Sequence, residues 1–206
     1  MNEIFGDWKY LLFLSGLTLL DAVRPATFVS KIVTIAVDSC IHSVVSSVAW
    51  YVVSVIMCND MREDIGLTRR EEAAVVWLMS AAVDGDHFIA ARSLDMYQAT
   101  HLATREGLIF HNPFIVAALV LFAHFYGLRP RLAAIIAIAM GSHVLRDATR
   151  TGLLLFPVGK SPPVPYIMFI AVMCFVPYAV SKYLRRSFQN KGFPVSLRPD
   201  DEGESV

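Results

Sequence analysis

Long apolar runs separated by short charged segments dominate the chain. Two runs, Ile32 to Met57 and Pro165 to Leu184, have the length that a helix needs to cross a bilayer, about 20 predominantly apolar residues. Leu132 to Phe156 is long enough and carries a charged cluster in its second half, and Asn112 to Tyr126 is shorter but strongly apolar. These four runs predict membrane-spanning helices.

Two further runs are weaker candidates. Glu71 to Val83 is short, and Trp8 to Val23 has an acidic residue near its end. The latter run also resembles a signal peptide, but its start carries a single basic side chain balanced by two acidic ones, so an uncleaved helix is the preferred interpretation. We predict an all-α fold, a multi-pass transmembrane helical bundle of five to six spans in one domain, residues 1–184. Residues 185–206 are basic, then acidic, and contain Pro and Gly, which predicts a disordered cytoplasmic tail.

Composition supports the membrane assignment. Hydrophobic residues make up 55% of the 206 residues, charged residues 17%, and the mean hydropathy is +0.52, which is more apolar than a soluble domain requires. The formal net charge is zero, so nothing indicates a nucleic-acid partner, and the lipid bilayer is the expected partner. Cys40, Cys58 and Cys174 lie in apolar runs without paired spacing, which indicates packing residues rather than disulfides or a zinc knuckle.

The basic residues predict which side of the membrane the connections face. With six spans both termini lie on one side, and three basic clusters fall on that side as well: residues 61–70, residues 128–131 and the tail after the last span. The positive-inside rule makes this side cytoplasmic. We therefore predict an integral, multi-pass membrane protein with cytoplasmic N- and C-termini.

Ionisable residues recur inside the predicted spans at helical spacing. Asp38 and His42 lie four residues apart on the second span, and His143 and Asp147 lie four apart on the fifth, so each pair shares one helix face. A charged group at membrane depth costs about 2.5 to 3.5 kcal/mol on insertion scales. Such residues are therefore expected to face a partner or a cavity rather than lipid.

A second set of polar residues lies at span ends. The sequence DGDH places Asp84, Asp86 and His87 at the end of the third span, and His111 begins the fourth. In the six-span topology these residues and the two pairs above all lie toward the non-cytoplasmic side, which predicts a shared site. Imidazoles and carboxylates suit a divalent transition metal such as zinc or manganese. The candidate metal ligands are Asp38, His42, Asp84, Asp86, His87, His111, His143 and Asp147, and the candidate anion- or substrate-binding residues are Arg105, Arg146, Arg150 and Lys160.

Simpler interpretations stay open beside the metal site. Asp147 with a neighbouring arginine is equally explained as an ion pair within the bundle, and DGDH on its own is better explained as a solvated helix end with a glycine stop. His101 and His124 have no carboxylate at helical spacing, and are expected in a loop and in a packing or interfacial position. The sequence around Gly159 does not complete a phosphate-binding loop, because Leu154 stands where that motif has its first glycine. Its prolines predict a stiff connection between two helices.

The order of these motifs resembles the transmembrane protein 267 family, an animal family of multi-pass membrane proteins. The likeness extends from about Asp38 to Tyr166, and SHVLRDATRTGLLLFPVGKSPPVPY is its most specific part. More distantly, the motifs are similar to bacterial LexA-regulated, membrane-bound, predicted metal-dependent hydrolases, which carry Asp-x-Asp-His-like, His-Arg-x-x-Thr-His and His-x-x-x-Asp elements. The resemblance implies an inherited polar set of Asp84, Asp86, His87, His111, His143 and Asp147. Here TREGLIFHN keeps Arg105 but lacks the first His and the Thr of the bacterial element, which implies fewer ligands or an altered activity.

Two functions follow as hypotheses. The first is a metal-dependent hydrolase of an anionic substrate, a phosphate ester or a lipid-like molecule, near the non-cytoplasmic leaflet. The second is a non-enzymatic membrane scaffold, or a transport or interaction component, that keeps the polar cluster for structure or ion binding. Geometry separates them, because convergence of four or more candidate ligands supports a metal site, whereas scattered ligands favour the second hypothesis.

Overall fold

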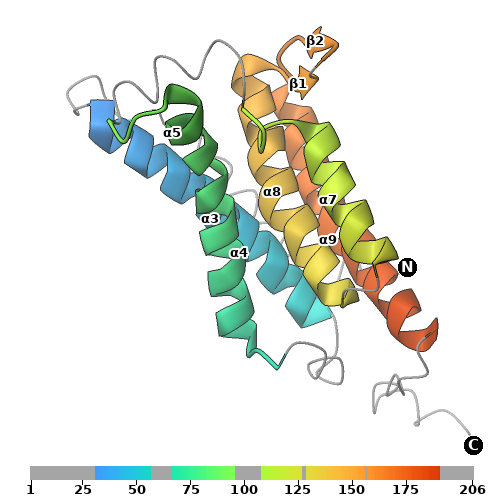
Figure 1. Ribbon diagram of the computed structural model, residues 1–206. Helices are drawn as coiled ribbons and strands as arrows, with labels where there is room; N and C mark the ends of the chain where they lie inside the picture. Colours follow the sequence, from blue (N-terminus) through green and yellow to red (C-terminus); the bar gives the residue numbers. More distant parts are fainter. Residues whose placement is uncertain (1–30, 57–65, 96–107, 127–128, 156, 191–206) are drawn as a thin grey trace, which may run out of the picture.

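The described part of the chain is a bundle of helices. The computed structural model describes residues 31–56, 66–95, 108–126, 129–155 and 157–190 (Figure 1). The predicted span Trp8 to Val23, His101, Arg105 and residues 191–206 lie outside the described residues. The prediction of an all-α bundle is confirmed, with the elements α3 (Lys31–Ile56), α4 (Arg69–Val83), α5 (Gly85–Ala91), α7 (Pro113–Phe125), α8 (Pro130–Thr151), β1 (Leu154–Leu155), β2 (Gly159–Lys160) and α9 (Tyr166–Asn190).

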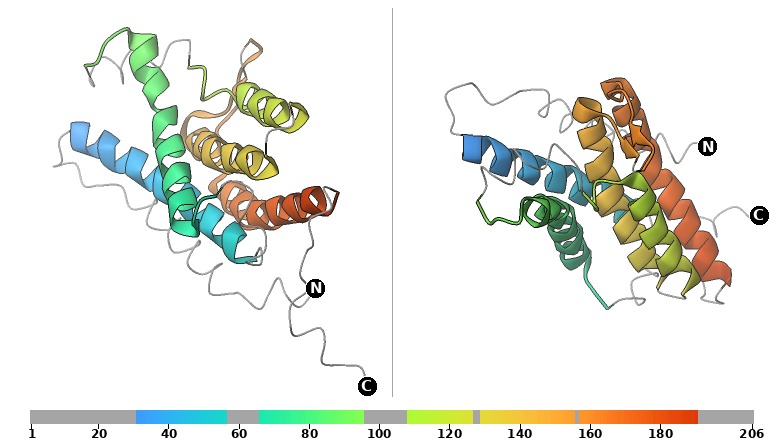
Figure 2. Two further views of the ribbon diagram at one scale, coloured as in Figure 1. Left: turned by 60° about the horizontal axis from the view of Figure 1, so that its bottom comes forward. Right: turned by 45° about the horizontal axis from the view of Figure 1, so that its top comes forward.

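Helix α8 lies at the centre of the bundle and packs against α3, α4, α7 and α9. Figures 1 and 2 show α7, α8 and α9 side by side in one layer, with α3 and α4 to one side of α8. Small residues line the buried faces of α8, among them Ala133, Ala134, Ala139 and Ala148. Small side chains let helix backbones approach closely, which stabilises helix packing where lipid supplies no hydrophobic attraction.

One apolar cluster fills the interior between these helices. Trp50 and Val53 from α3, Ile135 and Ile138 from α8, and Phe169 from α9 are all almost fully buried in it. Because its members come from all three helices, the cluster joins α3, α8 and α9 into one core. This core fixes how α3 crosses α8, and that crossing sets the positions of the polar residues on both helices.

The outer faces of α7 and α9 are apolar. Phe114, Leu121 and Phe125 on α7, and Ile167 and Phe175 on α9, are each more than half exposed. Such a surface suits hydrocarbon rather than water, which supports an integral membrane protein. Within the described residues, three helical segments are long and apolar enough to cross a membrane, Arg69–Ala91, Pro130–Thr151 and Tyr166–Asn190, and α7 is a shorter apolar helix.

The helices lie close to the predicted spans. Helix α7 begins and ends within one residue of the predicted run, and the described residues of α3, apart from Lys31, all lie within the predicted run, whereas α8 ends at Thr151, before the predicted Phe156. Helix α9 continues past Leu184 to Asn190. The predicted run from Glu71 to Val83 is short because it covers only α4; α5 follows directly and extends the helical path to Ala91.

Local signals explain where the helices begin. Thr68 and Glu71 form a capping box at the start of α4, in which each side chain bonds the backbone N–H of the other residue. The side chain of Asn112 accepts a hydrogen bond from the Phe114 backbone and caps α7. Proline at the first turn of α7 and α8 suits these starts, because the first helical N–H groups have no partner within the helix.

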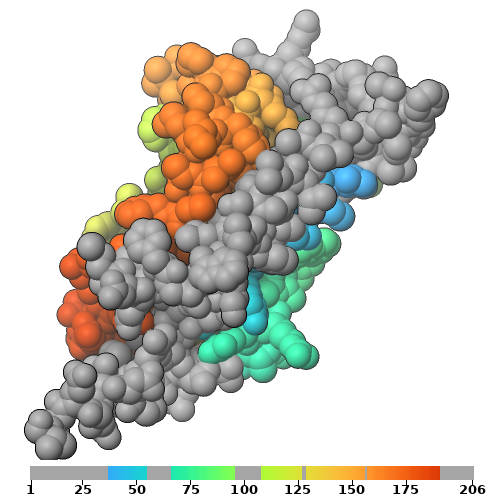
Figure 3. Space-filling model, turned by 180° about the vertical axis from the view of Figure 1, so that it is seen from behind, coloured from blue at the N-terminus to red at the C-terminus, as the bar shows by residue number. Residues whose placement is uncertain are grey.

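The segment between α8 and α9 folds as a short hairpin where the prolines predicted a stiff connection. Gly152 ends α8 with φ 79°, and a Cβ at this position would overlap the carbonyl oxygen of Ser161, so the close approach requires glycine. Strands β1 and β2 pair antiparallel, and Val164 donates its N–H to the Ala148 carbonyl at 2.8 Å. Figure 3 shows the hairpin and the beginning of α9, in orange, together on the rear surface.

Candidate metal centre

Four segments bring the candidate ligands together at the end of the bundle that is uppermost in Figure 1: the first half of α3, the junction of α4 with α5, the residues before α7, and the second half of α8. Asp84 lies at the junction, where it follows α4 and precedes α5. Helix α5 begins at Gly85, and Asp86 is buried. The alternative interpretation of DGDH as a solvated helix end with a glycine stop is therefore wrong.

Four side chains converge on one position. His111 Nε2 lies 3.1 Å from Asp147 Oδ2 and 3.7 Å from Asp84 Oδ1. His143 Nε2 lies 3.2 Å from Asp84 Oδ1 and 3.6 Å from Asp147 Oδ2. The two nitrogens and the two oxygens therefore alternate around a common centre.

These separations match the edges of a metal coordination shell. A tetrahedral ion with bonds of about 2.0 to 2.2 Å holds its ligand atoms roughly 3.3 to 3.6 Å apart. His143 is fully buried and His111 is 7% exposed, and neither Nε2 atom has a hydrogen-bond partner among the residues that the structure describes. Buried polar nitrogens are normally hydrogen-bonded, so two that face carboxylates without a hydrogen bond need an explanation. A divalent cation between the four atoms provides one.

Further contacts orient the two imidazoles. His111 Nδ1 lies 3.1 Å from Asp86 Oδ2, and the Phe110 backbone N–H donates to the same oxygen at 2.9 Å. On the other ring, His143 Nδ1 lies 3.5 Å from the hydroxyl of Ser80. Histidines that bind metals usually donate the other ring N–H to a carboxylate or another acceptor, which fixes the tautomer. Asp86 and Ser80 occupy those supporting positions here.

Burial and neighbouring charge act in opposite directions on His111, which lies before α7. Burial lowers the pKa of the His111 imidazole, but the carboxylates of Asp147, Asp84 and Asp86 raise it more, to about 11. These surroundings favour positive charge at this position, and a divalent cation satisfies the same preference as a proton.

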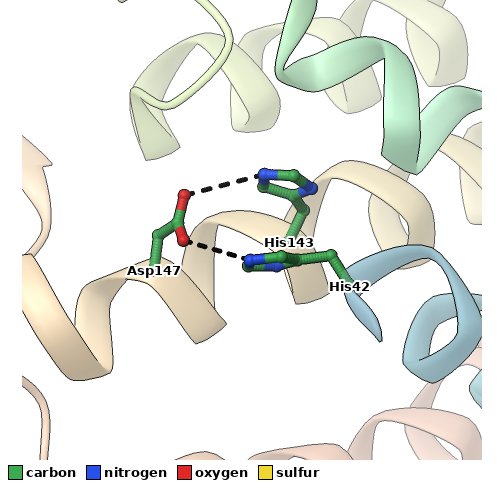
Figure 4. A group of neighbouring side chains, drawn as sticks. All are labelled: His42, His143 and Asp147. Carbon is green, nitrogen blue, oxygen red and sulfur yellow. Dashed lines mark ion pairs between the residues drawn. The ribbon is translucent and has the colours of Figure 1, made fainter. Parts of the chain in front are cut away.

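Asp147 also contacts a third imidazole. Its Oδ1 lies 3.3 Å from His42 Nε2, while its Oδ2 faces His143 (Figure 4). The rings of His42 and His143 are stacked, with centroids 4.1 Å apart and planes inclined by 20°. The carboxylate therefore lies across the edges of two parallel rings.

Asp38 joins the cluster to two arginines. Arg146 donates to Asp38 Oδ1 at 3.0 Å, and Arg150 donates to Asp38 Oδ2. The Oδ2 atom also lies 3.7 Å from His42 Nε2. Of the four predicted anion-binding residues, Arg146 and Arg150 thus contact Asp38, Lys160 is exposed in β2, and Arg105 lies outside the described residues.

His87 and His124 differ in their relation to the cluster. His87 Nε2 lies 4.0 Å from Asp84 Oδ1, and its ring is edge-on to that of His111 at 4.8 Å, so His87 lies at the border of the centre. His124 is near the opposite end of α7, where its Nδ1 lies 2.9 Å from the hydroxyl of Tyr183.

The sequence did not identify two polar groups that the structure places in the interior. Ser46 lies 2.9 Å from Ser80 and 2.6 Å from Ser142 through their hydroxyl oxygens, which links α3, α4 and α8 beneath the centre. Glu72 and Arg131 form a buried ion pair between the beginnings of α4 and α8. The serine group has one sequence signal, because Ser80 precedes Asp84 by one helical turn.

The fold and the cluster define an all-α membrane protein with a buried histidine–aspartate centre. The chain is 29% identical over 170 residues to transmembrane protein 267 of Mus musculus, an alignment that covers 79% of this chain and 75% of the relative. The homologue of Xenopus laevis is 29% identical, covering 78% and 74%, and that of Danio rerio is 25% identical, covering 70% and 64%. These similarities support a relationship to the transmembrane protein 267 family. No family model and no solved structure matches the chain.

Proposed function

We propose that the chain is an integral-membrane, metal-dependent hydrolase of an anionic substrate, a phosphate ester or a lipid-like molecule, with its site near the non-cytoplasmic leaflet. The observation that carries this proposal is the convergence of His111 Nε2, His143 Nε2 and the carboxylates of Asp84 and Asp147. Two imidazoles with two carboxylates are a donor set that suits zinc or manganese. A divalent ion held by these residues would supply Lewis-acid activation of a water molecule at neutral pH.

The side chains around the ligands have separate tasks in this proposal. Asp86 holds His111 so that Nε2 points at the centre, and Ser80 supports His143 in the same way. Arg150, which contacts Asp38, is 44% exposed, and Lys160 in β2 is also exposed. Their positive charge favours the approach of an anionic group, and a bilayer surface provides anionic esters in its headgroups.

Metal content tests this proposal directly. Protein purified without chelator should carry zinc or manganese, measured by inductively coupled plasma mass spectrometry. His111→Ala and His143→Ala should lose most of the metal, because each removes one of four ligand atoms. His124→Ala is the matched control, since His124 contacts Tyr183 and lies away from the centre, and it should keep the wild-type metal content. A folded, monodisperse wild type that takes up neither metal when incubated with it would overturn the proposal.

Hydrolysis needs a separate measurement. The metal-loaded protein should cleave bis(p-nitrophenyl) phosphate, activity should disappear after removal of the metal, and it should return when the metal is restored. The His143→Ala variant should show no activity above that of the metal-free wild type. Bound metal without turnover of any phosphate mono- or diester would favour the second function below.

A non-enzymatic role with a structural ion is the second candidate. The observation that favours it is that contacts of Asp38 with Arg146 and Arg150, and of Asp147 with His42, connect α3 to α8, as expected of polar side chains that hold a bundle together. In that case removing the metal should lower the thermal stability of the bundle, and no phosphate ester should be hydrolysed under any metal loading.

A further inference from the structure

We infer that the centre holds two divalent ions rather than one, with the carboxylate of Asp147 bridging them. This inference rests on the proposed metal site and adds a second position to it. The second position lies between His42, Asp147 and Asp38, on the α3 side of the first.

The two oxygens of Asp147 face different imidazoles. Oδ2 lies 3.1 Å from His111 Nε2 and 3.6 Å from His143 Nε2, which are both ligands of the first position. Oδ1 lies 3.3 Å from His42 Nε2 and therefore points to a different place (Figure 4). A carboxylate arranged in this way offers one oxygen to each of two ions.

The stacking of His42 on His143 sets the spacing between the two positions. The ring centroids are 4.1 Å apart and the rings are nearly parallel, and both Nε2 atoms approach the same carboxylate. Two-metal centres hold their ions about 3.5 to 4 Å apart. Ions in front of two rings stacked at 4.1 Å would thus have a separation close to that of such centres.

The second position has three protein ligand atoms within reach. The third atom, besides His42 Nε2 and Asp147 Oδ1, is Asp38 Oδ2, which also accepts a hydrogen bond from Arg150 and lies 3.7 Å from His42 Nε2, close to the edge of a metal coordination shell. His42 is buried, at 3% exposed, while Asp38 is 31% exposed. Three protein ligands at a partly accessible position leave room for water or substrate, which is the arrangement of catalytic rather than structural metal sites.

A second ion would change the sign of the net charge of the cluster. Asp38, Asp84, Asp86 and Asp147 contribute four negative charges, and Arg146 and Arg150 two positive ones, so the net charge is −2 with neutral histidines. One divalent ion brings the net charge of the cluster to zero, and two ions bring it to +2. Only the two-ion form attracts an anionic ester through its net charge.

The experiment compares metal stoichiometry in four proteins purified without chelator and then loaded with Mn²⁺. The wild type and His124→Ala should bind two ions per chain, and His42→Ala should bind one. His143→Ala tests the first position and should lose the ion held there. If His42→Ala does not remain monodisperse, His42→Gln replaces it, because the amide keeps a polar group of similar reach while removing the imidazole.

Electron paramagnetic resonance of the Mn²⁺-loaded proteins provides the second readout. Two ions bridged by Asp147 should give an exchange-coupled spectrum in the wild type, and His42→Ala should give the six-line spectrum of an isolated ion. One ion per chain with a six-line spectrum in the wild type would overturn the two-ion centre and leave the proposed hydrolase intact. No bound ion would overturn both proposals, and two uncoupled ions unaffected by His42→Ala would refute the bridging position.

Discussion

The contact between Asp86 and His111 allows the proposed metal centre to be tested without removing one of its four proposed ligands. Both the Nδ1 of His111 and the Phe110 backbone N–H meet the same atom, Asp86 Oδ2. In Asp86→Asn the amide oxygen can occupy that position and accept both bonds, so the change removes mainly the negative charge. In Asp86→Ala both acceptor contacts disappear, and the orientation of the His111 ring is lost with them.

The expected magnitudes follow from this difference. Residues that hydrogen-bond to metal ligands usually contribute about 10- to 100-fold to metal affinity. We expect Asp86→Asn to weaken metal binding about 10-fold, a loss of about 1.4 kcal/mol in binding free energy. Asp86→Ala should weaken it about 100-fold, a loss of about 2.7 kcal/mol. Competition with a fluorescent zinc chelator measures the dissociation constants, and Asp95→Asn, an exposed acidic residue after α5, is the control for loss of charge. Wild-type affinity in both Asp86 variants, with the proteins folded, would refute the supporting role of Asp86.

Three further predictions concern the bundle around the centre. Glu72→Gln should destabilise the protein by about 3 to 5 kcal/mol, because it leaves Arg131 buried without its charge partner, whereas the double variant Glu72→Leu/Arg131→Met should unfold at a higher temperature than the single one. Gly152→Ala should cost on the order of 1 to 3 kcal/mol through backbone strain, seen as a lower thermal midpoint; an unchanged midpoint would contradict the close approach to the hairpin. An epitope tag after Phe193 should be cytoplasmic and one within residues 92–105 on the opposite side, and protection of both on the same side would refute the predicted topology.

The apolar runs were sufficient to locate the helices because helix length in a membrane is set by a physical thickness. The run beginning at Asn112 gave the limits of α7 to within one residue, and the run beginning at Ile32 covers nearly all of the described helix α3. The spacing of Asp38 with His42, and of His143 with Asp147, placed each pair on one helix face, and the six-span topology brought both pairs to one level. The contacts between these pairs in the structure are those that the spacing made possible.

Contacts that depend on how two helices cross could not be predicted from the sequence. Arg131 was counted only as a basic residue of a connection, yet it is buried against Glu72, because α8 begins beside the first turn of α4. Arg146 and Arg150 were predicted to bind an anionic group, and the sequence did not show that the crossing of α3 over α8 also brings both of them to Asp38. No pattern along one helix contains the angle at which it meets another, so these partners could only come from the fold.

The depth of the centre follows from the two polar groups on α8. Arg131 and His143 are twelve residues apart, which along a helix is about 18 Å. The hydrocarbon core of a bilayer is about 30 Å thick. If Arg131 lies at one boundary of this core, His143 therefore lies within the core and does not reach the opposite boundary. Ionisable groups at that depth must be enclosed and paired, and both are buried against partners from other helices. A centre at that depth would be reached more readily by a lipid-like ester within the bilayer than by a fully hydrated solute, so we expect the lipid-like half of the proposed substrate class to be the better substrate.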